Sequence, residues 1–134
     1  MASIRGSVDS DHTPLVTVAV ASTSGPSTFV DAVIDTGFTG FAQIPAPLAR
    51  ELGLTARTAT ETQYPDGRID TIPLAWAEVT LGSSVREGFV HIQSGSDEAI
   101  VGLEFLRLFR KTLVLSVADG TVLLIDSLAD LTSA

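Results

Sequence analysis

Short apolar runs separated by turn-forming residues recur along the whole chain, and this spacing constrains the fold more than any other feature. In residues 15–21, valines occupy alternate positions at Val16, Val18 and Val20. This is the period of a β-strand, because successive side chains of a strand point to opposite faces. Glycine, proline, serine and aspartate mark the turns between the runs. The pattern predicts strands or extended segments at 15–21, 28–34, 40–44, 55–64, 68–81, 85–93, 112–117 and 121–125, with a further short apolar run at 99–102.

Two short helices interrupt the strands. Residues 45–53 have proline near the start and glycine just past the end, the asymmetry of a short helix. Residues 103–109 predict a second helix, with Leu103 and Leu106 facing the interior and Phe105 as a further candidate. Many short strands with one or two small helices indicate an all-β barrel or sandwich.

The chain is long enough for one domain. Its 134 residues fall in the range of roughly 100–200 that a single core usually occupies. Hydrophobic residues make up 45% and charged residues 18%, which suits a compact core and not a disordered chain. We expect a polar N-terminal arm at 1–13, the folded domain at 14–125 and a loosely packed tail at 126–134.

Charge and composition exclude several classes of function. Sixteen acidic and eight basic residues give a net charge of -8, and the basic residues are scattered, so no nucleic-acid partner is expected. The absence of cysteine excludes disulfides, thiolate nucleophiles and sulfur-ligated zinc. There is no signal-like apolar segment and no run of about 18 apolar residues, so we expect no membrane association and a cytoplasmic location.

Common catalytic motifs are missing. The sequence has no G-x-S-x-G elbow, no phosphate-binding G-x-x-x-x-G-K loop and no H-E-x-x-H zinc motif. Its two histidines, His12 and His91, are far apart in sequence and are expected to be surface or satisfied side chains. No metal and no cofactor are predicted.

One carboxylate stands out. Asp35 ends the apolar strand predicted at 28–34 and is followed by Thr36 and Gly37. Strand interiors avoid aspartate, and an aspartate among apolar neighbours is costly unless it is hydrogen-bonded. Glycine at position 37 would let backbone amides approach the carboxylate without a Cβ in the way. The alternative is an ordinary aspartate-initiated turn after a strand.

Three segments in order resemble the aspartic peptidases. Val33-Ile34-Asp35-Thr36-Gly37 is similar to their active-site motif of two apolar residues followed by Asp-Thr-Gly. Ile100-Val101-Gly102, before the second helix, resembles the element that threads beside that motif in a ψ-shaped crossing. Between them, Tyr64-Pro65-Asp66-Gly67 stands where the family has its flap hairpin. The order and spacing resemble the single-lobe, retropepsin-like branch over residues 14–125.

The resemblance implies a closed barrel with a flap hairpin, and it assigns roles to residues. It implies that Asp35 is catalytic and that Thr36 hydrogen-bonds across to a second copy of the chain. Phe38 would line the substrate cleft or pack in the core, and Tyr64 would reach the cleft or remain an exposed aromatic residue of the hairpin. The residues implied to support the active site are Thr36, Gly37 and Gly102, and those implied to contact substrate are Phe38, Tyr64, Asp66, Gly67 and Ile100.

Aspartic proteolysis requires two carboxylates that share one proton across a water molecule. This chain has a single Asp-Thr-Gly, and Asp126-Ser127-Leu128, which also follows an apolar pair, lacks the glycine. A second Asp35 must therefore come from another subunit, which predicts a homodimer with twofold symmetry. The predicted activity is that of an aspartic endopeptidase acting on extended, largely apolar peptides.

Two other interpretations remain open from the sequence. A catalytically silent module with the same fold could bind peptides or mediate assembly, because fold does not establish function. A small, unrelated β-barrel in which Asp35 is only a turn residue is the more remote alternative.

Overall fold

Eleven strands and two short α-helices follow one another in the computed structural model, which describes residues 3–131. The all-β fold class is therefore confirmed, and so is the strand nature of nearly every predicted run. The strands are β1 Ile4–Arg5, β2 Ser7–Val8, β3 Pro14–Ala21, β4 Thr28–Ile34, β5 Ala42–Pro45, β6 Thr58–Gln63, β7 Ile69–Leu81, β8 Ser84–Gln93, β9 Ala99–Val101, β10 Thr112–Ser116 and β11 Thr121–Ile125. The helices are α1 Ala46–Glu51 and α2 Leu103–Leu108, followed by a 3-10 helix at Leu128–Leu131.

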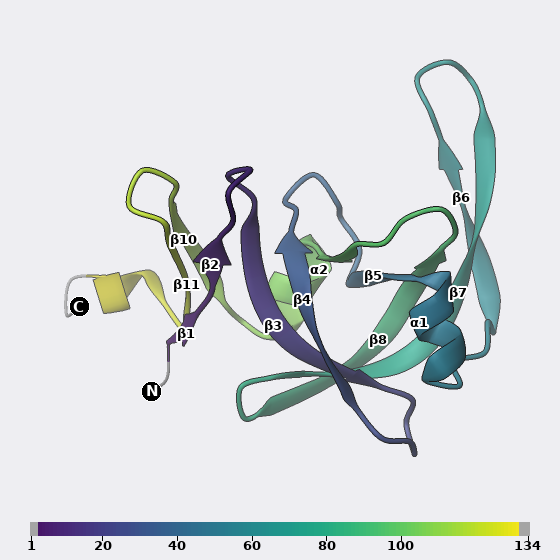
Figure 1. The fold of residues 1–134 in the computed structure, drawn as a ribbon, viewed down its shortest axis with the longest axis horizontal. Helices are drawn as coiled ribbons and strands as arrows, with labels where there is room; N and C mark the ends of the chain where they lie inside the picture. The colour runs from purple at the N-terminus through teal and green to yellow at the C-terminus, as the bar shows by residue number, and fades with distance from the viewer. Residues whose placement is uncertain (1–2, 132–134) are drawn as a thin grey trace.

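Six strands close into a barrel. Neighbouring strands pair in the order β3-β4-β9-β5-β8-β7, and β7 returns to β3 through the pairs Ala19–Thr80, Val20–Val79 and Ala21–Glu78. The 13-residue β7 is long enough to pair with β3, β6 and β8 along its length. Figure 1 shows β3 and β4 curving across β7 and β8 at the base of the barrel. Closure leaves few free edges, which is how many all-β folds avoid exposed strand backbones.

Apolar side chains from the strands and from α2 fill the interior. Val18 on β3 and Val79 on β7 are almost completely buried, as the alternating pattern predicts. From α2, Phe105 reaches the core with 0% of its surface exposed and packs against Phe109, the ring centroids lying 4.8 Å apart. Phe41 completes this aromatic cluster, with ring centroids 6.2 Å from Phe105 and 6.5 Å from Phe109.

The inward face of α2 differs from the prediction. Leu103, predicted to face the interior, is 43% exposed, whereas Phe105 is fully buried. The backbone amide of Leu103 donates to the Phe38 carbonyl at 2.9 Å, which fixes the rotation of the first turn of the helix. With that rotation, Phe105 and Phe109 lie one turn apart on the inward face, because residues i and i+4 share a helix face. Leu103 therefore lies at the surface.

The N-terminal residues pair with the body of the fold. Ile4 and Arg5 pair with Leu124 and Leu123 of β11. Ser7–Val8 pairs with the start of β3, and Ile4 and Val8 pack against the core. This corrects the expectation of a polar arm over 1–13, of which residues 1–2 lie outside the described residues. Two isolated apolar side chains give no strand pattern, so this pairing depends on partners far along the chain.

The β6–β7 hairpin extends beyond the barrel. Its six paired positions run from Thr58–Leu74 to Gln63–Ile69. In Figure 1 it projects to the top right, on the side of the molecule where β4 ends. The predicted long hairpin with a polar tip is confirmed.

Candidate active site

Asp35 lies where β4 ends. β4 runs parallel to β9, with Val33 opposite Ile100 and Ile34 opposite Val101. The Asp35 amide continues this pairing by donating to the Val101 carbonyl at 3.0 Å. The side chain then leaves the sheet and is exposed to solvent, as is that of Thr36. Two paired strands thus hold the backbone of a carboxylate that is open to a ligand.

The turn after Asp35 orients its carboxylate. The Gly37 amide donates to Oδ1 of Asp35 at 2.8 Å, and the Phe38 amide donates to the Asp35 carbonyl at 3.1 Å. A Cβ at position 37 would lie 3.1 Å from the same Oδ1, closer than ordinary van der Waals contact. Glycine therefore lets the amide approach the carboxylate, although the same contacts also occur in ordinary Asx turns.

Gly102 is the point where the two sequence motifs cross. A Cβ at this position would lie 2.3 Å from the Phe38 carbonyl oxygen and 2.6 Å from that of Gly40. The 35–41 loop is tied to the start of α2, because Leu103 donates to Phe38 and Gly102 donates to the Phe41 carbonyl at 3.3 Å. The structure therefore packs the loop that follows Asp35 directly against Gly102.

The flap residues contact one another. The Tyr64 and Arg68 main chains are joined by a 2.8 Å hydrogen bond, and the Arg68 guanidinium lies 4.2 Å from the centroid of the Tyr64 ring. A hydrogen bond with Asp70 raises the pKa of the Tyr64 hydroxyl. Asp66 Oδ1 accepts the Arg68 amide at 2.9 Å, and Gly67 adopts a φ of +88°, which favours glycine. These contacts order the tip but do not join Tyr64, Asp66 or Gly67 to Asp35.

Phe38 packs against a histidine that the sequence analysis did not place near the site. The Phe38 and His91 ring centroids are 5.0 Å apart, and both side chains are half-buried. A Cβ on Gly40 would lie 2.5 Å from Cζ of Phe38 and 3.1 Å from Cε1 of His91, so glycine leaves room for this pair. Ile100 is also half-buried, on β9 beside Val33. The packing alternative for Phe38 thus matches its contacts.

Burial lowers the pKa of His91 below its usual value. The unfolded chain therefore binds more protons than the folded chain around the ordinary histidine pKa of about 6.5. The free energy of unfolding is expected to fall as the pH drops from 7 towards 5, and His91→Gln should remove this part of the fall. Urea unfolding at several pH values measures the effect. His12→Gln, at an exposed turn residue, should retain it, and identical pH dependence in wild type and His91→Gln would contradict the assignment.

The described residues contain neither a cluster of metal-binding side chains nor a membrane-spanning helix. Within residues 3–131, no group of three or more histidine, cysteine, aspartate or glutamate side chains is arranged to hold a metal ion. None of the helices in this range has the length and apolar character needed to cross a membrane.

Solved structures share this architecture. A crystal structure of a retropepsin-like aspartic protease from Rickettsia conorii matches with a TM-score of 0.64 and 14% identity, covering 92% of this chain and 90% of that one. The solution structure of the simian foamy virus protease matches with a TM-score of 0.52 and 11% identity, covering 73% of this chain and 99% of that one. The fold is therefore retropepsin-like, a closed β-barrel with a flap hairpin and two short helices.

A comparison of sequences places the chain in a family. It is 33% identical over 86 residues to an uncharacterized protein of Archaeoglobus fulgidus, covering 61% of this chain and 67% of that protein. The chain belongs to the same family as this archaeal protein. No protein-family model matches the chain.

Proposed function

We propose that the protein is an aspartic endopeptidase that works as a homodimer, with one Asp35 contributed by each subunit. The observation that carries this proposal is the position of Asp35. Its carboxylate is exposed at the end of β4, held by the Gly37 amide, and lies on a loop fixed by the Gly102 crossing. The retropepsin-like fold of two solved proteases supports the same function.

The chemistry follows from two like charges held close together. Two carboxylates at short range do not both ionise easily, so in the proposed mechanism they share one proton. The ionised Asp35 removes a proton from the water molecule, whose oxygen attacks the peptide carbonyl carbon. The protonated Asp35 of the other subunit donates its proton to the carbonyl oxygen. Collapse of the tetrahedral intermediate, with proton transfer to the amide nitrogen, then breaks the C–N bond.

The surface around Asp35 supports pairing of two chains. Asp35 and Thr36 are both exposed in the single chain, and Leu103, whose amide binds the same loop, is 43% exposed. A second copy placed on a twofold axis beside Asp35 would cover this surface. In the proposed dimer, the Thr36 hydroxyl hydrogen-bonds across the axis and holds the two loops together.

Substrate is proposed to bind as an extended peptide between the 35–40 loops and the flaps. The ordered tip at Asp66 and Gly67 offers a rigid cover, and the Tyr64–Arg68 contact gives it a charged edge. The half-buried side chain of Ile100 is proposed to contact the substrate, and Phe38 is proposed to support the floor of the cleft by packing against His91. An ordered tip of this kind favours substrates that reach the cleft without a large opening of the flap.

A diverse peptide library tests the proposal. Incubation with the dimeric protein, followed by mass spectrometry, should reveal internal cleavage products with a bell-shaped dependence of rate on pH. Tight binding of some peptides without cleavage of any would contradict the proposal and favour a silent peptide-binding module.

A further inference from the structure

A cavity outside the Asp35 site combines apolar walls with acidic groups. It has a volume of about 350 Å³ and lies between the outer face of β7–β8 and the start of α2. Pockets of roughly 300–1,000 Å³ are typical of sites for small ligands and side chains. Its lining includes Leu74 and Trp76 from β7, Glu87, Phe89 and His91 from β8, and Glu104 from α2.

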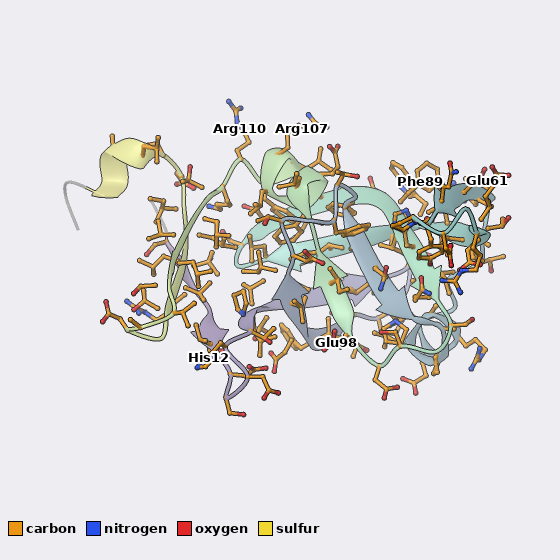
Figure 2. All side chains as sticks on the ribbon, turned by 90° about the horizontal axis from the view of Figure 1, so that it is seen from above. His12, Glu61, Phe89, Glu98, Arg107 and Arg110 are labelled. Atoms are coloured by element: carbon orange, nitrogen blue, oxygen red, sulfur yellow. The ribbon has the colours of Figure 1, made fainter. Side chains whose placement is uncertain are left out.

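Strand register places the aromatic wall. Trp76 is directly opposite Phe89, and Leu74 is opposite His91, so all four side chains share the outer face of the sheet. The Trp76 and Phe89 rings meet edge to face, with centroids 4.9 Å apart. Phe89 is 41% exposed, and Figure 2 labels it at the upper right of the view. The wall is therefore apolar and open to solvent.

Two carboxylates lie in the same cavity. Oε1 of Glu87 accepts the Trp76 indole N–H at 3.2 Å, which holds the carboxylate beside the ring. Glu104 is paired with Arg107, one turn further along α2, and this pair is exposed. Burial disfavours the charged form of His91, so the imidazole does not cancel the acidic charge at neutral pH. The cavity thus presents an aromatic wall with a net negative rim.

We propose that this cavity binds an arginine side chain of a peptide or protein partner. Arginine has an apolar stem that packs on Leu74 and Trp76, and a planar guanidinium that stacks on aromatic rings and pairs with carboxylates. Glu87 faces the same space as the Trp76 ring, so one guanidinium can contact both. The net charge of -8 also favours approach of a basic partner.

The cavity adjoins the loop that carries Asp35. Gly40 lines the cavity, and His91 both lines it and packs against Phe38. An arginine bound here would lie beside this loop, as part of a longer substrate or of a separate partner. The proposal does not depend on the peptidase function, because it requires binding and no hydrolysis.

Trp76, the single tryptophan of the chain, reports on the cavity directly. The test is a fluorescence titration of the Asp35→Asn protein, which would not cleave the probe, with the peptide acetyl-Gly-Arg-Gly-amide. A saturable change in Trp76 emission is expected. The matched peptide with citrulline in place of arginine, which keeps the shape but lacks the charge, should bind about tenfold more weakly.

The Glu87→Gln variant provides a second test of arginine binding. Glutamine keeps an acceptor for the Trp76 indole N–H but removes the charge, so binding of the arginine peptide should weaken about tenfold. Glu98→Gln is the control, because it makes the same charge change at an exposed residue well separated from Phe89 in Figure 2. Equal affinity for the arginine and citrulline peptides, or no saturable change with either, would overturn the proposal whatever the protein does to peptide bonds.

Discussion

Replacement of Asp35 by asparagine is expected to lower peptide hydrolysis by about 10²- to 10⁴-fold, the typical contribution of a positioned acid or base. Asparagine keeps the size of aspartate, and its Oδ1 can still accept the Gly37 amide, so the turn should be preserved. It removes the ionisable group from both subunits and with it the like-charge repulsion between them. The variant should therefore remain folded and at least as dimeric as wild type, as sedimentation would show.

Asp31 offers a matched control on the same strand. It is exposed on β4, and its Oδ1 accepts the Thr17 hydroxyl at 2.7 Å, a contact that asparagine can also make. Asp31→Asn should leave the cleavage rate unchanged. Undiminished cleavage by Asp35→Asn, or equal losses in the two variants, would contradict a catalytic role for Asp35.

Substitution of Gly102 by alanine is expected to damage both stability and activity. The new Cβ would overlap the Phe38 and Gly40 carbonyl oxygens, which belong to the backbone and cannot rotate away. Overpacking of this kind costs about 1–3 kcal/mol of unfolding free energy. Relief of the overlap moves the 35–41 loop, and a displacement of about 1 Å at a catalytic group can reduce the rate by about 100-fold.

Gly120→Ala is the control that separates a loss of activity from a general loss of stability. Gly120 lies in the β10–β11 turn with a φ of +66°, and a Cβ there would meet nothing within 4 Å. Alanine in this left-handed conformation costs about 1–2 kcal/mol, a loss of stability similar to that expected at Gly102. Its cleavage rate at a temperature where both variants are folded should match wild type. If Gly102→Ala lost stability but kept full activity, the crossing would be structural only.

Local sequence patterns predicted most strands and both helices. Contacts between residues far apart in the sequence determine the features that were not predicted. Alternating valines at 16, 18 and 20, and the Pro65-Asp66-Gly67 turn, identify their strands and hairpin without reference to the rest of the chain. The rotation of α2 was not predictable in this way, because it is fixed by the hydrogen bond from Leu103 to Phe38. The strand at Ile4 likewise depends on a partner, Leu124, at the other end of the sequence.

In the candidate site, too, single residues could be predicted from the sequence, but contacts between distant segments could not. Asp35 stood out because strand interiors avoid aspartate and because Thr36 and Gly37 follow it. The structure shows that its side chain is exposed and that its amide donates to the carbonyl of Val101, the residue before Gly102. The packing of His91 against Phe38 could not be inferred, because it follows from the parallel pairing of β5 with β8. The cavity at Trp76 depends in the same way on the register of β7 and β8.

In the proposed dimer, two Asp35 loops face each other across a twofold axis, and a cysteine crosslink measures this arrangement directly. The chain has no cysteine, so Thr36→Cys introduces a single thiol beside Asp35, and Ser24→Cys introduces one at an exposed turn as the control. With a short bis-maleimide, Thr36→Cys is expected to form covalent dimers rapidly and Ser24→Cys to form few. Crosslinking that is equally slow in both variants, under conditions where sedimentation shows dimers, would place the Asp35 loops apart and rule out a dimer in which the two Asp35 side chains meet.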